Sequence, residues 1–565
     1  MTTSKEFPSE KAKASATSAA TGADGLDKPT ANTPPISPPS YPEGLKLYTV
    51  LASVYMTVFL VALDRTIIGT AVPKITDDFH SINDVGWYAS GYLLPAAAFM
   101  LIFGKLYRFY SVKAVYLCCV IIFEIGSAIC GSALNSTALI VGRAVAGLGS
   151  AGLFSGTVMI MVHTIPIQRR PLFQGLFGAC MGLASAVGPL LGGALTDKAS
   201  WRWCFYINLP IGAFVILFLV LFLHTPSPPT SETASLTEHF LRLDPIGTLI
   251  FLPGTTLLLL ALQWGGTTHP WSSVRVVTCL VLAFALLVLF IAVQVWKQDA
   301  ATVPPRIITQ RSVGAAVFYT FMNGASMQVV IYYIPIWFQA VQGVSAVDSG
   351  IRTLGLVLPM VVASAASGIV CNRIGHYAPQ MILGSIITSV GAGMLTMWQV
   401  RSSAGQWIGY QVLYGFGMGL GLQAPGMAVQ TTLSRKDIPT GTALMFFTQM
   451  IGGAVFVSAA QNIFASKLRI YLTGIPGIDA AILIESGATA LRRMVDGDML
   501  AEVLKVFNTA LTKTFYVAVA VSIAGIVGAL CVEWNNVKNG EGQGEKKRMM
   551  KKSDTEANAE RMKPT

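Results

Sequence analysis

Residues 178–195 read GACMGLASAVGPLLGGAL, a stretch that is apolar and long enough to cross a bilayer as a helix. Its glycines recur at intervals of about one helical turn, at Gly178, Gly182, Gly188, Gly192 and Gly193. A helix face without side chains lets a neighbouring helix approach closely in lipid. Pro189 removes a backbone hydrogen bond and bends the helix. The stretch therefore predicts a bent, closely packed membrane helix, whose shape serves either tight packing alone or a conformational change.

The composition of the whole chain indicates a membrane protein. Of its 565 residues, 53% are hydrophobic and only 12% are charged, whereas soluble domains carry about 25% charged residues. Apolar runs of about 20 residues span a bilayer as helices rather than as barrel strands, so we predict an all-α polytopic membrane protein. The net charge of +11 lies mostly in short loops and in the C-terminal tail. Membrane topology explains this charge, and binding to nucleic acid is not expected.

The apolar runs predict about fourteen transmembrane helices. Their approximate limits are 46–71, 85–104, 113–133, 137–163, 172–196, 203–224, 245–264, 274–296, 313–338, 350–371, 380–398, 405–429, 440–464 and 514–533. Residues 467–513 contain an apolar stretch that is too short and too interrupted to span, so we assign them to one loop.

The spans group into two bundles of six helices, with two further helices inserted between them. In chain order we predict a disordered tail at 1–45, the first bundle at 46–225, a linker with the inserted helices at 226–312, the second bundle at 313–534 and a basic tail at 535–565. An even number of spans puts both termini on one side of the membrane. Lys and Arg in the short loops favour the cytosol for that side by about two to one. The loop 467–513 is then external.

Two pairs of segments repeat between the bundles. IVGRAVAGLG at 140–149 matches IGYQVLYGFG at 408–417, in the fourth span of each bundle. More loosely, the loop GKLYRFYSVK from Gly104 matches GIVCNRIGHY from Gly368, and each joins the second and third spans. Duplicated halves with a substrate site between them are the layout of secondary transporters. The repeat therefore favours transport of a small molecule.

Three ionisable residues inside the first bundle are the main candidates for chemistry, because charges are costly in lipid and usually functional. Asp64 and Arg143 both lie within about 10 Å of the outer boundary, so they can pair. Glu124 lies near the midplane. A buried carboxylate that loses a neighbouring Arg binds a proton, so these three residues predict proton coupling. For Asp64 the alternatives are a capped or snorkelling charge near the interface and a local pair with Arg65. For Arg143 the alternative is a purely structural pair, and for Glu124 it is a protonated carboxyl hydrogen-bonded to a helix.

Amides and aromatic rings stand out in the second bundle, where Gln411 occupies the position of Arg143. Such side chains suit a large, mostly apolar ligand. The predicted substrate cavity comprises Asn323, Gln328, Tyr332, Gln411, Gln423 and Gln449. For any single aromatic residue, packing within the bundle or contact with lipid is the alternative.

Several motifs give the chain a family resemblance over about residues 45–535. They are LDRTII at 63–68, GR at 142–143, WRWCFYINLP at 201–210 and YYIP at 332–335. These motifs resemble the fourteen-span drug:proton antiporter branch of the major facilitator superfamily, and within it the fungal toxin and multidrug efflux pumps. The pattern G-x3-G-x5-G-P-x2-G-G at 178–193 resembles the antiporter motif of the superfamily's exporters. The resemblance implies that Asp64 takes part in proton coupling and Arg143 in proton transfer.

The loop between the second and third spans departs from the superfamily pattern. That pattern is G-x-L-x-D-R-x-G-R-K, whereas residues 104–113 read GKLYRFYSVK and place Arg108 at the acidic position. The Asp of the pattern helps to latch the cytosolic side, so its role does not carry over by resemblance. The copy in the second bundle stays closer to the pattern. The predicted residues of the cytosolic gate are Gly104, Arg108, Asn372 and Arg373.

These features predict a proton-coupled exporter of small, largely apolar organic compounds, such as a toxin, a secondary metabolite or a drug, that works by alternating access. We expect a monomer in the plasma membrane, or else in the vacuolar membrane, that uses the proton gradient and neither a cofactor nor a metal. An importer of the same superfamily, for a sugar, a siderophore or an anion, is a second hypothesis, which the antiporter motif disfavours. A membrane-embedded enzyme is a third, but the six His form no histidine box. The chain has no nucleotide loop of the G-x4-G-K-[ST] type, which disfavours transport driven by ATP.

Overall fold

The computed structural model describes residues 41–80, 84–225, 243–266, 268–473, 497–539 and 550. The first bundle contains α1 (Leu45–Phe79), α2 (Val85–Phe109), α3 (Val112–Gly131), α4 (Ser136–Thr164), α5 (Arg170–Lys198), α6 (Trp203–Tyr206) and α7 (Asn208–Phe222). The inserted segment contains α9 (Pro245–Trp264), α10 (Val274–Lys297), the 3-10 turn η2 (Gln298–Ala300) and α11 (Pro305–Ile308). The second bundle contains α12 (Arg311–Ala340), α13 (Ala346–Ile374), α14 (Ala378–Leu395), α15 (Ala404–Leu422), α16 (Ala424–Thr432), α17 (Ile438–Leu472), α20 (Gly497–Cys531) and the 3-10 turn η3 (Val537–Asn539).

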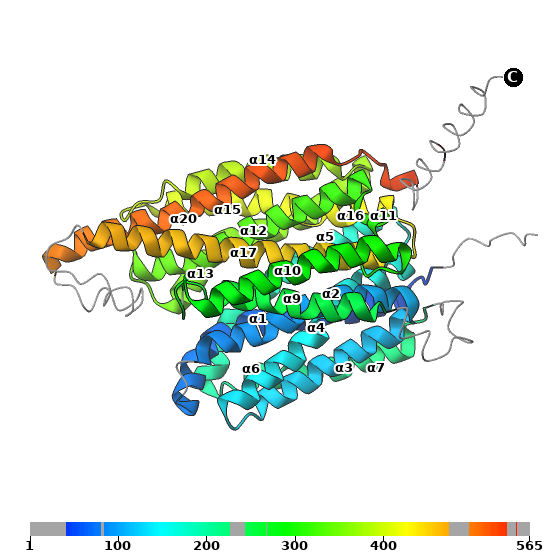
Figure 1. Cartoon of the computed structure of the whole chain (residues 1–565), viewed down its shortest axis with the longest axis horizontal. Coiled ribbons are helices and arrows are strands. Elements are labelled where there is room, and N and C mark those ends of the chain that lie inside the picture. The colour runs from blue at the N-terminus through cyan, green and yellow to red at the C-terminus, as the bar shows by residue number, and fades with distance from the viewer. Residues whose placement is uncertain are drawn as a thin grey trace, which may run out of the picture. The chain divides into compact units, whose positions relative to one another are not determined.

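Helices dominate the described residues, which otherwise contain two isolated β-bridges. Among these described residues, thirteen helices are long and apolar enough to cross a membrane. They include every predicted span except 313–338, which lies in the 30-residue helix α12. The all-helical polytopic fold is thus confirmed, and α12 is the segment on which the count of fourteen depends. We call the end at which α1 begins and α20 ends the terminal end, and the opposite end the distal end (Figure 1).

Local sequence signals set several helix limits. The side chain of Asn135 accepts a hydrogen bond from the backbone N–H of Ala138 at 2.8 Å, which caps the start of α4. A capping box of Ser403 and Gln406 opens α15. Gly375 follows α13 with a φ of 82°, a left-handed conformation that glycine adopts without strain.

The predicted loop 467–513 was too long at both ends. Helix α17 continues to Leu472 and α20 begins at Gly497, while residues 474–496 lie outside the described part of the chain. Apolar side chains at these helix ends, including Leu468 and Phe507, are buried in one cluster. Packing between α17 and α20 therefore prolongs both helices past the points at which hydropathy alone ended the spans.

The tail predictions fall largely on residues that the structure does not describe, namely 1–40, 540–549 and 551–565. Residues 535–539, which we assigned to the basic tail, instead pack against the end of α13. The N–H of Val537 donates to the carbonyl of Gly375 at 2.8 Å, and Val537 is buried. These few residues belong to the second bundle because they satisfy backbone groups at a helix end.

The repeated glycines make matching contacts in the two bundles. A Cβ atom on Gly147 of α4 would lie 2.2 Å from the carbonyl oxygen of Tyr92 on α2. In the second bundle, a Cβ atom on Gly415 of α15 would lie 2.1 Å from the carbonyl oxygen of Leu356 on α13. Only glycine permits such close backbone approach. The repeated segments therefore occupy corresponding places in their bundles.

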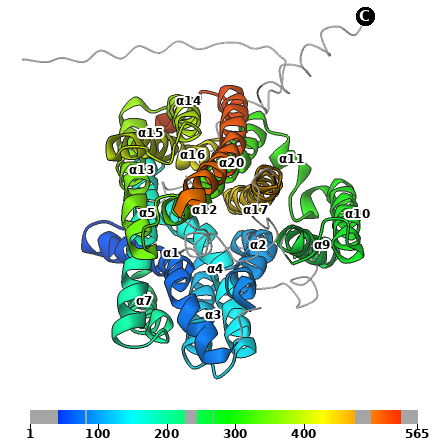
Figure 2. The same cartoon turned by 90° about the vertical axis from the view of Figure 1, so that its left-hand side faces the viewer.

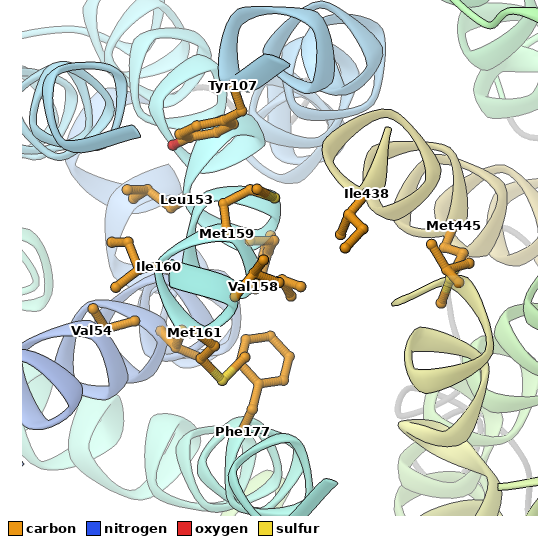
Figure 3. Close-up of a cluster of buried hydrophobic side chains, with 14 of the residues drawn as sticks. Val54, Tyr107, Leu153, Val158, Met159, Ile160, Met161, Phe177, Ile438 and Met445 are labelled. Atoms are coloured by element: carbon orange, nitrogen blue, oxygen red, sulfur yellow. The ribbon is translucent and has the colours of Figure 1, made fainter. Parts of the chain in front are cut away.

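The hydrophobic core is shared between the bundles at the terminal end only. There, one buried cluster, which we call the terminal core, includes Val158 and Phe177 of the first bundle together with Ile438 and Met445 of α17. Figure 3 shows side chains of α4 and α5 opposite those two residues. At the distal end, the buried members of two separate clusters come from α1–α6 in one case and from α12–α15, α17 and α20 in the other. The bundles are therefore joined at the terminal end and have separate cores at the distal end.

The two bundles meet along two seams. On one seam α5 packs against α13, and on the other α2 packs against α17. Figure 2 shows α9 and α10 beside α2 and α17. Nε2 of Gln263 on α9 donates to Oγ of Ser90 on α2 at 2.7 Å, and Oγ of Ser458 on α17 donates to the carbonyl of Leu262 at 3.1 Å. The inserted helices thus contact both bundles along the α2–α17 seam.

Candidate functional site

A buried ion pair joins α1 to α4 in the first bundle. Nη1 of Arg143 lies 2.6 Å from Oδ2 of Asp64, and the two side chains are 2% and 0% exposed. Nε of Arg143 donates to the carbonyl of Tyr88 at 3.1 Å, and the guanidinium carbon lies 4.4 Å from the ring centroid of Tyr92. The pair that helix depth predicted is therefore present. Removing either partner would leave an uncompensated buried charge, which is strongly destabilising.

Asn208, the first residue of α7, extends this pair toward α3. Its Nδ2 donates to Oδ1 of Asp64 at 3.4 Å and to Oγ of Ser127 at 3.1 Å, and its side chain is fully buried. In the sequence, Asn208 stands within the WRWCFYINLP motif, and it is not among the predicted site residues. The available signal was a polar amide at the start of an otherwise apolar helix.

Glu124 lies in the middle of α3, close to α7. It is 9% exposed, and neither carboxyl oxygen has a hydrogen-bond partner among the described residues. A Cβ atom on Gly212 of α7 would lie 2.0 Å from Oε1, so the missing side chain makes room for the carboxyl group. The structure does not show the helix hydrogen bond that was the alternative for Glu124. An unpaired buried carboxyl is costly when it is charged, so this group is suited to holding a proton.

The glycines of α5 at the terminal end pack against the second bundle. A Cβ atom on Gly178 would lie 2.2 Å from Oγ of Ser364, and one on Gly182 would lie 2.4 Å from Cγ2 of Val361, both on α13. Gly175 of α5 is also in close contact, with a built Cβ 2.6 Å from the carbonyl oxygen of Ser364. This part of the antiporter motif therefore forms the α5–α13 seam between the bundles.

The glycines of α5 nearer the distal end face α1 instead. A Cβ atom on Gly188 would lie 2.1 Å from Oγ1 of Thr66, and one on Gly192 would lie 2.4 Å from Oγ1 of Thr70. Gly193 has no such neighbour within 4 Å. The predicted close packing of α5 is therefore present, but two different helices supply its partners.

Helix α5 thus connects the seam between the bundles to the buried ion pair. Pro189 follows Gly188, the first of these glycines to face α1, and its Cβ lies 3.9 Å from a Cβ built on Gly350 of α13. Thr66, which packs on Gly188, is two residues from Asp64 on the same helix. One helix therefore packs both on α13 and on the segment of α1 that carries Asp64.

At the terminal end, Arg108 of α2 pairs with an acidic residue of the second bundle. Its Nη2 lies 3.5 Å from Oδ1 of Asp437, which precedes α17. Arg306 of α11 donates two hydrogen bonds to the same carboxylate, at 2.7 and 2.9 Å. Burial raises the pKa of Asp437, but the hydrogen bonds from Arg306 and the charge of Arg108 outweigh it, so the pKa stays below its ordinary value. The acid that the loop motif lacks is therefore supplied by the opposite bundle.

The other predicted gate residues differ in their contacts. Gly104 is in close contact with α17, since a Cβ atom there would lie 2.6 Å from Cβ of Ala443. Nδ2 of Asn372 donates to the carbonyl of Gln168 at 2.5 Å, which also links the two bundles. Arg373 has an exposed side chain, and its carbonyl accepts a hydrogen bond from Lys538 of the same bundle. Arg373 therefore does not share the cross-bundle contacts of the other three.

Two residues of the predicted substrate cavity lie inside the packing of the second bundle. Gln411 is buried and donates to the carbonyl of Trp407 at 3.1 Å. It lies beside Gly355, and in the first bundle Arg143 lies beside Gly91 in the same way. Asn323 lines a cavity of about 10 Å³, enough for one water molecule, between α12, α14, α15 and α20.

The remaining cavity candidates lie elsewhere. Gln328 and Gln449 pack against glycines at the contact of α12 with α17. Tyr332 is 47% exposed. Nε2 of Gln423 lies 2.9 Å from a Cβ built on Gly178, at the α5–α13 seam. The structure therefore does not gather the six residues in one pocket.

Comparison with known proteins fits this architecture. A sequence model of the Major Facilitator Superfamily matches residues 54–457. The chain belongs to this superfamily. It is 48% identical over 522 residues to the MFS-type efflux pump MFS1 of Trichophyton rubrum, which covers 92% of this chain and 97% of that protein. It is 46% identical over 501 residues to the efflux pump aflT of Aspergillus parasiticus, which covers 88% and 98% of the two chains.

A further relative is the rubrofusarin-specific efflux pump aurT of Gibberella zeae, which is 46% identical over 501 residues and covers 89% of this chain and 92% of that protein. Among solved structures, XylE, a proton:xylose symporter of the superfamily, aligns with a TM-score of 0.55 at 11% identity and covers 85% of this chain and 94% of XylE. At that identity the likeness shows the fold alone. As a member of the major facilitator superfamily, the chain is a multi-pass membrane transporter and not an enzyme.

Proposed function

We propose that this transporter exports small, largely apolar organic compounds, such as a toxin, a secondary metabolite or a drug, in exchange for protons. The names of its relatives support export, since MFS1 and aflT are efflux pumps and aurT is an efflux pump specific for rubrofusarin. In this proposal the terminal end faces the cytosol, and the protein works as a monomer in the plasma membrane. The proton gradient is its energy source, and it needs no cofactor.

The arrangement of the cores supports alternating access. Because the bundles share a core only at the terminal end, this conformation is closed toward the cytosol and corresponds to release of substrate to the outside. Cross-bundle contacts of Arg108 and Asn372 close the same end. Opening toward the cytosol requires these contacts and the α5–α13 seam to separate. Substrate would then enter between the bundles from the cytosolic side.

The single observation that carries proton coupling is the buried pair of Asp64 and Arg143. The charge of Arg143 stabilises Asp64 as a carboxylate in the conformation described. In this conformation, which is open to the outside, a proton from the outside binds Asp64 and neutralises it, and the pair with Arg143 separates. The bundles then open toward the cytosol, and the movement of α5 relative to α13 shifts the segment of α1 that it packs on. The pair re-forms in the cytosol-facing state and releases the proton there, so each cycle moves protons inward and substrate outward.

The test is transport in proteoliposomes that hold a fluorescent lipophilic dye, rhodamine 6G, under an imposed pH gradient. We expect the wild-type protein to accumulate dye against its gradient, and the accumulation to collapse when a protonophore is added. Asp64→Asn should abolish accumulation while leaving downhill dye flux measurable. Asp348→Asn is the matched control, because this exposed carboxylate lies at the start of α13 and bonds locally with Ser345. Dye accumulation by the wild type without any pH gradient would refute proton coupling.

A further inference from the structure

The contacts of Asn208 reach beyond the Asp64–Arg143 pair. Its amide nitrogen donates both to Asp64 on α1 and to Ser127 on α3, while its Oδ1 has no partner among the described residues. An amide that touches a carboxylate on one helix and a hydroxyl on another fixes the distance between those helices. This position is fully buried, so water does not compete for the two hydrogen bonds.

The same face of α7 also reaches Glu124. Asn208 and Gly212 are one helical turn apart, as are Ser127 and Glu124 on α3. Asn208 touches Ser127, and Gly212 makes room for the carboxyl group of Glu124. Hydrogen bonds thus run from Asp64 through Asn208 to Ser127, and Glu124 lies one turn of α3 further along the same face of α7. We call this row of groups the polar path.

We propose that Asn208 is a positioning residue that couples Asp64 to Glu124 as a second proton-binding carboxyl; this inference rests on the proton exchange proposed above. Glu124 has no cationic partner among the described residues, whereas Asp64 has Arg143. In the conformation described, Asp64 is the carboxylate and Glu124 holds a proton. When Arg143 withdraws and Asp64 gains a proton, the amide loses its charged acceptor. Asn208 then moves with α7 and α3 and changes the surroundings of Glu124.

The charged and titratable groups around this path are few. Besides Glu124 itself, they are Asp64 and Arg65 of α1, Tyr92 of α2, Cys130 of α3, Arg143 of α4 and Cys204 of α6. Arg143 is already engaged with Asp64, and Arg65 carries a fixed positive charge that acts on Asp64. The phenol and the two thiols carry no charge at neutral pH. The two carboxyl groups are therefore the pair between which proton occupancy is shared. Two such groups in a low dielectric environment do not both ionise readily, so the state of one depends on the state of the other.

The experiment compares Asn208→Ala, Glu124→Gln and the double variant in the rhodamine 6G proteoliposome assay. The readouts are the dye gradient held at a fixed pH gradient and the downhill dye flux over a range of pH. We expect Asn208→Ala and Glu124→Gln each to lower the held dye gradient by about tenfold, in the range of typical coupling between sites, with downhill flux retained. The double variant should equal either single variant, because both changes break one path. The pH dependence of flux should flatten in all three.

Asn508→Ala is the matched control, since this buried amide of α20 bonds with Trp337 and Trp398 and, within the part of the chain that the structure describes, with no carboxyl group. If Asn208→Ala acted only through packing, it would lower the flux and the held dye gradient together, as Asn508→Ala would, and leave the pH dependence of flux unchanged. That result would overturn the proposal. Effects of the single variants that multiply in the double variant would overturn it as well. If Asn208→Ala does not reconstitute, Ser127→Ala tests the same path with a smaller change. If the wild type accumulates dye without a pH gradient, the proposed exchange of substrate for protons is itself refuted.

Discussion

Replacing Arg108 with Gln should weaken closure of the terminal end. The guanidinium is 12% exposed and lies 3.5 Å from a carboxylate that is 1% exposed. Asp437 keeps its two hydrogen bonds from Arg306, so it is not left unpaired. The expected loss is therefore that of one charged contact, about 1.5–3 kcal/mol. Because this contact crosses between the bundles, the loss falls on the closed conformation, and the open population should rise about 10- to 150-fold.

Cys371 offers a reporter for this opening. It lies near the end of α13, is 4% exposed and belongs to the terminal core. With the other cysteines replaced by serine, its rate of labelling by a water-soluble maleimide reports how often the terminal end opens. We expect Arg108→Gln to raise this rate by about tenfold or more, in proportion to the open population.

The matched control is Arg311→Gln. Arg311 is an exposed cation at the same end, and its Nε donates to the carbonyl of Cys531 within the second bundle. Its loss should leave labelling of Cys371 unchanged. If Arg108→Gln labels no faster than the wild type, the contact with Asp437 does not hold the terminal end closed, and the reasoning from it is wrong.

Three further predictions concern the ion pairs and the glycine face. Gly178→Val places side-chain atoms within 2.2 Å of Ser364, so dye transport should fall at least about tenfold, as measured in proteoliposomes at matched protein content. Arg143→Lys keeps the charge but loses the hydrogen bond to the carbonyl of Tyr88, and the held dye gradient should fall by about tenfold. The pKa of Asp437 is below its ordinary value, so its contribution to stability is present above about pH 4 and is lost as pH falls further. Thermal unfolding in detergent should therefore show a loss below about pH 4 that is absent in Asp437→Asn.

Hydropathy was sufficient to locate the helices, because a chain in lipid must satisfy its backbone groups within each span. It was less informative where a helix leaves the membrane. At the ends of α17 and α20, buried side chains such as Leu472 and Val503 continue the helices beyond the apolar runs. Helix α12 shows the opposite mismatch. It contains amides and small residues, so it is not among the helices that are apolar enough to span by composition, although it is buried between its neighbours.

The candidate site was predictable to the extent that depth along a helix determines contact. Asp64 and Arg143 lie at equal depth, and the structure pairs them. Asn208 was not found in this way, because its contacts depend on how α7 is rotated about its axis. Arg108 was interpreted as the loss of a latch residue, since the compensating charge of Asp437 lies in the other bundle and no local pattern connects the two. The amides of the second bundle share composition but not one location, which sequence spacing does not reveal.

The two seams between the bundles differ in a way that explains the position of the glycine-rich helix. On the α2–α17 seam, the inserted segment contacts both bundles: at the distal end through Gln263 and Ser458, and at the terminal end where Lys105 donates to the carbonyl of Ala300. These contacts tie the bundles together on one side. A rocking motion of the bundles must then be taken up mainly on the opposite side, along the α5–α13 seam. That is where Gly178 and Gly182 permit close approach, and where α5 reaches the helix that carries the buried carboxylate. In the proposed mechanism, the seam that must move therefore lies next to the carboxylate that binds the proton.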